Sequence, residues 1–130
     1  MNRSSYEVEE FPDVTQGFGS GQVLKLGWTP GRLRYMIATG VIRPRRRGTR
    51  WEFRFDDLVL LRTLRRLEAE GVPRRRLYRA FRNLHRQVGP GVSVASVQLS
   101  WEEGRLLARR GRQVWHPETG QICLPGWLPA

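Results

Sequence analysis

Residues 26–67 read LGWTPGRLRYMIATGVIRPRRRGTRWEFRFDDLVLLRTLRRL, and this stretch decides the fold. Gly27 interrupts the preceding helical run, and Thr29 suits the N-cap position of a new helix. Pro30 suits the first turn of that helix, where its missing N–H costs nothing. The pattern therefore predicts a helix over residues 30–39.

The two sides of this predicted helix differ in chemistry. Three apolar residues share the side that we expect to be buried, namely Leu33, Met36 and Ile37. Arg32 and Tyr35 fall on the opposite side, with Arg34 on a flank. We expect an exposed face of arginine and tyrosine, which is suited to a recognition helix in the major groove of DNA.

A basic hairpin, or wing, is predicted directly after the helix. Gly40 ends the helix, and Val41 and Ile42 can begin a strand. Residues 45–48, RRRG, predict a turn rich in positive charge. Residues 50–55, RWEFRF, alternate polar and aromatic side chains, so we expect a returning strand that buries its aromatic residues, Trp51, Phe53 and Phe55.

Three further helices are predicted around this unit. Ser20 can cap a short helix over residues 21–26, in which the inward residues are Val23, Leu24 and Leu26. Asp56 or Asp57 can begin a longer helix with a carboxylate at its positive end. Its buried stripe consists of leucines three residues apart, Leu58, Leu61, Leu64 and Leu67. Pro73 begins a last helix, which the GPG sequence at 89–91 ends.

Two apolar residues, Val59 and Leu60, lie beyond what the leucine stripe requires. We expect them to be exposed and to form a protein interface. They favour an alternative function for the chain, that of an adaptor that docks another protein.

The order of these motifs resembles the DNA-binding domain of MerR-type regulators. The matching segments are TPGRLRY (29–35), GVIRP (40–44), the basic hairpin, DDLVLLRTLRRL (56–67) and GVPRRRLYRAF (71–81). Together they cover Leu26 to about Leu84. The resemblance implies an α+β fold, a winged helix-turn-helix of about four helices with a wing hairpin. Two residues depart from the family pattern: Met36 replaces its usual second tyrosine, and Trp51 replaces its usual arginine.

The resemblance implies a non-enzymatic transcription regulator in the bacterial cytoplasm, associated with the nucleoid, with double-stranded DNA as its partner. Arg32 and Tyr35 would lie near base edges, while Arg34 and the wing arginines would hold phosphates. The expected DNA-binding residues are Thr29, Arg32, Arg34, Tyr35, Arg43, Arg45, Arg46, Arg47 and Arg50.

Composition agrees with a polyanionic partner. The formal net charge is +11, and all the basic residues except Lys25 are arginines, which can bind phosphate and guanine in a bidentate manner. This charge also suits RNA or the ribosome, so a basic RNA-binding protein is a second alternative. With 130 residues, the chain is too short for a large enzyme pocket.

The C-terminal part predicts a small antiparallel meander over residues 92–124, whose β-like runs are VSVASVQLSW, RLLARR, QVW and QICL. It resembles a segment that follows the MerR-like domain in longer proteins with tetratricopeptide repeats. We expect it to act as a lid on the last helix or as a docking surface for RNA polymerase or another protein. MerR-type dimers use a long helix where Gly89 and Pro90 stand, so we expect a monomer or a weak dimer.

The predicted organisation is a flexible arm over residues 1–19, the winged helix-turn-helix over 20–88, and the meander with its tail over 89–130. We expect Phe18 to pack on the core, and three tryptophans to serve as the core of the meander rather than line a ligand pocket, Trp101, Trp115 and Trp127. His85, His116 and Cys123 lack the spacing of metal ligands, so we expect no metal or other cofactor. The sequence predicts no membrane span and no signal peptide.

Overall fold

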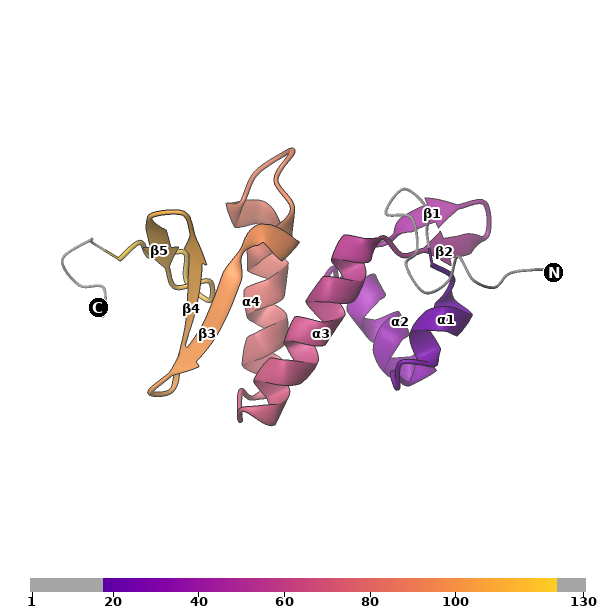
Figure 1. Ribbon diagram of the computed structural model, residues 1–130, viewed down its shortest axis with the longest axis horizontal. Helices are drawn as coiled ribbons and strands as arrows, with labels where there is room; N and C mark the ends of the chain where they lie inside the picture. The colour runs from indigo at the N-terminus through magenta and orange to yellow at the C-terminus, as the bar shows by residue number, and fades with distance from the viewer. Residues whose placement is uncertain (1–17, 124–130) are drawn as a thin grey trace.

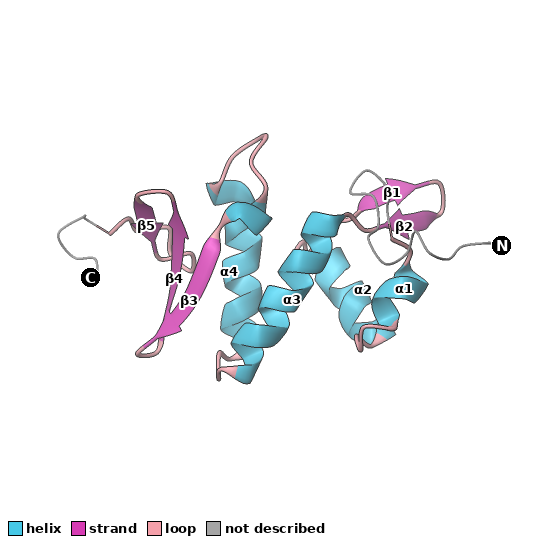
Figure 2. Ribbon diagram, viewed as in Figure 1, coloured by secondary structure: helices cyan, strands magenta, loops and turns pink. Residues whose placement is uncertain are grey.

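The computed structural model describes residues 18–123, in which two long helices separate a helix-turn-helix with its wing from a three-stranded sheet (Figures 1 and 2). The elements, in chain order, are α1 (Ser20–Leu24), α2 (Pro30–Ala38), β1 (Arg45–Arg47), β2 (Arg50–Glu52), α3 (Phe55–Ala69), α4 (Arg74–Gln87), the 3-10 helix η2 (Val94–Ser96), β3 (Gln98–Glu102), β4 (Arg105–Arg110) and β5 (Gln113–Trp115). This confirms the predicted α+β class.

Helix α1 begins one residue earlier than the sequence predicted. Its N-cap is Gly19 and not Ser20, because the Gln22 side chain folds back and its Oε1 accepts a hydrogen bond from the Gly19 N–H at 2.8 Å. Val23 is buried as expected. Leu26 was expected to face inward, but it lies beyond the end of the helix and is 53% exposed.

Helices α3 and α4 form the middle of the molecule. Asp57 lies in the first turn of α3, and its Oδ2 accepts a hydrogen bond from the Arg54 N–H at 2.8 Å, which satisfies one free donor at the helix start. The leucines of the predicted stripe are buried in the core except Leu58, which is half-buried. Gly71 adopts a φ of 107°, a conformation that favours glycine, in the turn between the two helices.

The wing differs from the prediction in its register. Val41 and Ile42 form no strand; both are fully buried in a bend before β1. The three arginines predicted to form the turn make up β1 itself, and the turn is Gly48–Thr49, where Gly48 has a φ of 63°.

The aromatic alternation of residues 51–55 holds only in part. Phe53 is fully buried, and its N–H and C=O bond to the backbone of Phe18 at 2.7 Å in both directions, which fixes Phe18 against the core. Trp51 is half-buried. Phe55 was expected to be buried but is 48% exposed, because it is the first residue of α3, where the two-residue period of a strand no longer applies.

The C-terminal segment forms an antiparallel sheet in the order β3-β4-β5. The first predicted run, residues 92–101, forms a strand only from Gln98 onward, because Val94–Ser96 is the helix η2. In the described part of the last run, Ile122 makes only an isolated bridge to Trp115. Leu99 pairs with Ala108, which pairs with Trp115, so these three buried residues share the sheet face that packs on the helices. Trp127 lies outside the described residues.

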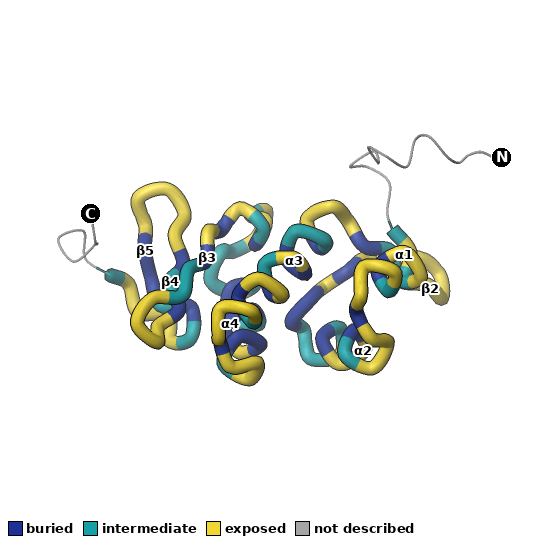
Figure 3. The backbone as a smooth tube through the Cα atoms, turned by 60° about the horizontal axis from the view of Figure 1, so that its bottom comes forward, coloured by how far each residue is buried: buried dark blue, intermediate teal, exposed yellow. Residues whose placement is uncertain are grey.

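One hydrophobic core runs from the helix-turn-helix into the sheet. Buried residues of α2, α3, α4 and the sheet belong to the same cluster, and the buried positions in Figure 3 extend along the chain from α1 to β5. Burying one large apolar side chain such as Phe81 contributes about 1.5–3 kcal/mol, so the sheet and the helices stabilise each other. Between residues 18 and 123, none of the helices is long and apolar enough to cross a lipid bilayer.

Candidate nucleic-acid interface

Helix α2 begins as the sequence predicted. The Thr29 hydroxyl accepts a hydrogen bond from the Arg32 N–H at 3.2 Å, and Pro30 occupies the first helical position. Leu33 and Met36 are buried and fix the helix on the core. The helix therefore presents its other side to solvent.

Tyr35 and Arg34 are the exposed side chains in the middle of α2. Tyr35 is 54% exposed, and its ring lies 5.9 Å from the ring of Tyr78 in α4, measured between centroids. Arg34 is also exposed, and it borders a hollow lined by the apolar atoms of Leu33, Ile37 and Trp51. Among the described residues neither side chain is held by a hydrogen bond or an ion pair, so both can reach a partner of the helix.

Arg32 is not exposed as the helical spacing predicted. Only 22% of its side chain is accessible, because the guanidinium turns toward α3 and α4. Its Nη2 donates to Glu68 Oε2 at 2.7 Å, and its Nε donates to the Tyr78 hydroxyl at 2.9 Å. The guanidinium also lies 4.7 Å from the centroid of the Trp28 ring. Spacing along one helix cannot reveal this, since all three contacts come from other parts of the chain.

The Glu68 carboxylate holds a second arginine as well. Arg74 Nε, at the first turn of α4, donates to the same Oε2 atom at 2.9 Å. Burial raises the pKa of Glu68, but the hydrogen bonds from Arg74 and Arg32 outweigh burial and hold the pKa below its usual value. For Arg32, burial lowers the pKa, and the hydrogen bonds with Tyr78 and Glu68 outweigh it and raise the pKa. Arg32 and Glu68 therefore form a charged pair at neutral pH.

Glu68 and Tyr78 carry no local sequence signal for this role. Glu68 stands among polar residues at the end of α3, and Tyr78 is 46 residues from the arginine that it contacts. Only the packing of α2 against α3 and α4 brings them together.

The wing carries the densest group of exposed arginines, Arg45, Arg46, Arg47 and Arg50. Arg46 pairs with Trp51 across the hairpin, and its guanidinium lies 4.7 Å from the centroid of the Trp51 ring. Its Nε also donates to the Gly48 carbonyl at 3.2 Å. Trp51 therefore supports an arginine from across the hairpin.

Glu52 offsets part of the wing's charge. Its two carboxylate oxygens lie 3.8 Å from Arg45 Nη1 and 3.4 Å from Arg47 Nε. Both arginines are at least half exposed, so these ion pairs are weak and leave the side chains able to exchange Glu52 for a phosphate. Arg43, at the base of the wing, is exposed beside Gly40, whose carbonyl accepts from Arg43 Nε at 3.4 Å.

His85 joins α4 to the base of the wing. Its Nε2 lies 3.0 Å from the Val41 carbonyl oxygen. Burial lowers the pKa of His85; the contact with Val41 opposes this shift, and the charge of Arg43 adds to it. The neutral ring is therefore favoured, and it donates through Nε2.

The two residues predicted to form a protein interface, Val59 and Leu60, differ in burial. Leu60 is only 4% exposed and belongs to the core, which corrects the prediction that it is free to bind a partner. The longer apolar face of α3 has a physical cause: the helix contacts η2 and β3 in addition to α4. Val59 is half-buried beside the exposed Leu26 and Phe55, in a hollow of about 360 Å³.

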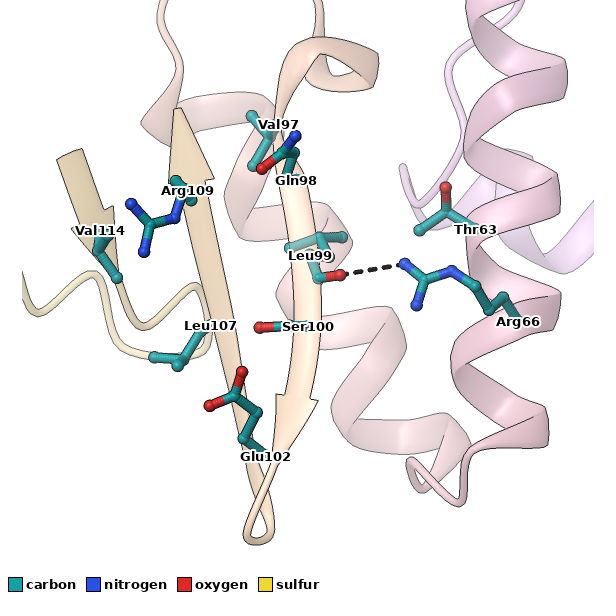
Figure 4. A pocket seen from close by; sticks show the side chains of 10 residues that line it. All are labelled: Thr63, Arg66, Val97, Gln98, Leu99, Ser100, Glu102, Leu107, Arg109 and Val114. Atoms are coloured by element: carbon teal, nitrogen blue, oxygen red, sulfur yellow. Dashed lines mark hydrogen bonds between the residues drawn. The ribbon is translucent and has the colours of Figure 1, made fainter. Parts of the chain in front are cut away.

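A further surface hollow lies between α3 and the sheet. The groove of about 560 Å³ between α3 and the sheet mixes polar and apolar side chains, and Arg66 crosses it to donate to the Leu99 carbonyl at 3.0 Å (Figure 4). Within residues 18–123, no three His, Cys, Asp or Glu side chains gather as metal ligands would; Cys123 Sγ lies 3.6 Å from His116 Nε2.

Comparison with known proteins identifies the helical part of the chain. A family profile described as "MerR HTH family regulatory protein" matches residues 23–84, which run from α1 through the wing and α3 into α4. No curated protein and no solved structure gives a significant match. The profile covers α2, the wing and the cluster around Glu68. Residues 23–84 of this chain therefore match the MerR-type helix-turn-helix family.

Proposed function

We propose that the chain is a non-enzymatic DNA-binding protein that acts as a bacterial transcription regulator of MerR type. The observation that carries this proposal is the pairing of an exposed Arg34–Tyr35 face on a capped nine-residue helix with an arginine wing beside it. A helix of this kind fits the major groove of B-form DNA, and the wing fits the adjacent backbone.

The proposed contacts divide into two groups. Tyr35 and Arg34 meet base edges from α2, while the wing and its base hold phosphates through Arg43, Arg45, Arg46, Arg47 and Arg50. At the N-terminus of α2 the backbone N–H of Gly31 can add a contact to a phosphate, because Pro30 has no N–H and that of Arg32 is bound to the Thr29 hydroxyl. In this proposal Arg32 supports the helix from behind and makes no base contact, because it is bound to Glu68 and Tyr78.

Selection of binding sites from random duplex DNA tests the proposal. We expect an enriched motif, which the double variant Arg34→Ala/Tyr35→Ala no longer selects. The matched control is Arg112→Ala, which removes one exposed arginine from the turn between β4 and β5, within the C-terminal sheet, and should select the same motif. Recovery of random sequence by the unaltered protein contradicts the proposal.

Duplex RNA of the selected sequence distinguishes the RNA-binding alternative. The deep, narrow major groove of A-form RNA does not admit side chains, so base readout by α2 requires DNA. We expect much weaker binding to the RNA duplex. Equal binding to both duplexes would show a grip on phosphates alone and would favour the RNA-binding alternative.

A further inference from the structure

Glu68 lies where three helices meet. It belongs to α3, and one of its oxygens accepts hydrogen bonds from Arg32 of α2 and from Arg74 of α4. The carboxylate is 21% exposed, and the two arginines approach it at 2.7 and 2.9 Å. Hydrogen bonds between charged groups at these distances are roughly twice as strong as neutral ones.

The two arginines held by Glu68 border the proposed DNA-binding face. Arg32 is two residues from Arg34 in α2. Arg32 and Arg74 line the same open hollow as Tyr35 and Tyr78, and its volume is about 560 Å³. A free arginine at either position could reach a phosphate on any DNA sequence. Glu68 holds Arg32 toward the protein, where Trp28 and Tyr78 also contact the guanidinium. Arg74 is 57% exposed, but its 2.9 Å hydrogen bond to Glu68 is shorter than the ion pairs of the wing and restrains the guanidinium.

Binding to phosphates is insensitive to sequence, whereas contacts with base edges discriminate. Each arginine withheld from the backbone therefore weakens binding to all DNA but leaves the base contacts of α2 unchanged. The bound Arg32 also fixes the rotation of α2 relative to α3 and α4. The first effect lowers the affinity for random DNA, and the second, by holding the base-reading helix in place, increases the ratio of specific to non-specific affinity.

We propose that Glu68 is a specificity-determining residue of the DNA interface, one that positions α2 and withholds Arg32 and Arg74 from the phosphate backbone. This inference rests on the proposed DNA-binding function. It adds a residue that touches no DNA and yet sets how well the protein distinguishes its site from random sequence.

The test compares Glu68→Gln with the unaltered full-length chain on the selected duplex and on random duplex DNA, at several salt concentrations. We expect the log-log salt slope on random DNA to steepen by about 1.8, because two freed arginines would each displace about 0.9 counterions. Between about 50 and 200 mM salt this makes the loss of affinity roughly tenfold larger. The ratio of specific to random affinity should fall.

The matched control is Glu70→Gln, which makes the same change of charge two residues further along the chain, at the C-cap of α3. Glu70 pairs with Arg66 at 3.0 Å, and Arg66 remains bound to the Leu99 carbonyl when that pair is lost. We expect the affinity ratio of this variant to match that of the unaltered protein. An equal fall of the ratio in both variants would show a general effect of net charge and overturn the inference.

Arg32→Met tests the same idea without altering Glu68. If Arg32 makes no phosphate contact, this variant keeps the salt slope of the unaltered protein, and in its background Glu68→Gln steepens the slope by only about 0.9, from Arg74. A slope that flattens by about 0.9 on Arg32→Met alone shows that Arg32 grips DNA, and this overturns the inference. The measurement stands even if Glu68→Gln folds poorly.

Hydrogen exchange in the absence of DNA separates this inference from the proposed function. We expect the amides of α2 to exchange faster in Glu68→Gln than in Glu70→Gln. Unchanged exchange of α2 contradicts the positioning role. If neither the unaltered protein nor any variant binds duplex DNA, both the proposed function and the specificity role fail. If all bind with the same slope and ratio, only the specificity role fails.

Discussion

Arg76 and Glu118 form a bidentate ion pair that joins α4 to the turn after β5. Arg76 Nε donates to Glu118 Oε2 at 2.9 Å, and Arg76 Nη2 donates to Oε1 at 2.7 Å. The Trp101 ring lies 5.2 Å from the same guanidinium. Asn83 lies further along α4, and its Nδ2 donates to the Pro117 and Glu118 carbonyls at 3.1 Å in each case. The turn is therefore bound to the helix at several points.

Replacing Glu118 with Gln should loosen the sheet from α4. The change removes the charge of the acceptor and leaves Arg76, which is about one-third exposed, with a weaker partner. We expect the free energy of unfolding to fall by about 1–2 kcal/mol in urea titrations. Glu102→Gln, in the exposed end of β3, is the control and should have little effect. Equal losses in the two variants would mean that the ion pair contributes nothing specific.

Acid should destabilise the protein through Glu118 and Glu68. The hydrogen bond from Arg76 lowers the pKa of Glu118; at Glu68, burial raises the pKa, but the bonds from Arg74 and Arg32 outweigh it. A carboxyl group whose pKa is lower in the folded state contributes stability that is complete above its usual value, 4.5, and is lost as the pH falls through the folded pKa. We expect the temperature of thermal unfolding to fall as the pH falls through this range, and we expect this temperature to depend less on pH in the double variant Glu68→Gln/Glu118→Gln. The same dependence on pH in the double variant and in the unaltered protein would contradict the prediction.

His85 should add a second loss of stability on acidification, one that begins at a higher pH than the loss caused by the two carboxylates. Burial lowers its pKa from 6.5, so the unfolded chain binds the proton more readily than the folded one. Its contribution is therefore complete above about pH 6.5 and declines as the pH falls toward the folded pKa. His85→Gln, which can keep a donor near the Val41 carbonyl, should remove this part of the pH dependence. NMR titration of the ring provides a direct measurement, and a pKa at or above 6.5 would refute the prediction.

Arg34 and Arg46 should affect DNA binding in different ways. Arg34→Ala should reduce discrimination between the selected site and its single-base variants by about 1–3 kcal/mol, because we propose that this side chain contacts base edges from α2. Arg46→Ala should weaken all sequences alike and flatten the salt slope by about 0.9, because this side chain lies near the turn of the wing. Competition titrations measure both effects. If the two variants show the same pattern, the division into base and phosphate contacts is wrong.

The protein should be a monomer in solution at micromolar concentration. Gly89 and Gly91 have φ values of 80° and 78°, and the chain turns there into the loop before η2 instead of extending α4 into a dimer helix. Stable association usually buries roughly 1,200–2,000 Å², and the C-terminal sheet turns its apolar face onto the chain's own helices. Sedimentation with and without the selected duplex tests this. A tight dimer free in solution would contradict it.

Sequence reasoning worked where local rules decide the structure. Thr29 and Pro30 define the start of α2 by themselves, and the glycines at 40, 71 and 89 each interrupt a helix, with φ values between 80° and 107°. The period of the leucines in α3 is likewise a property of one helix. The number of long helices followed from these signals, whereas the family followed from the order of the motifs, which resembles that of MerR-type regulators.

Sequence reasoning failed where a residue's environment is supplied by distant parts of the chain. Leu60 was assigned to the surface because the sequence of α3 does not show that η2 and β3 pack against this helix. Arg32 was assigned to the surface because its partners lie 36 and 46 residues away. Phe55 was assigned to the core because the strand pattern gives no sign that α3 begins at that residue.

The stacking of Arg46 on Trp51 has a consequence for the entropy of binding. An arginine that is free in solution loses rotamer freedom when it binds a phosphate, and immobilising such a side chain costs about 0.5–1.5 kcal/mol. In this wing, the indole and the Gly48 carbonyl already restrict the guanidinium before any partner arrives. Trp51 adds no charge, but it reduces the side-chain entropy that Arg46 loses when it binds a polyanion.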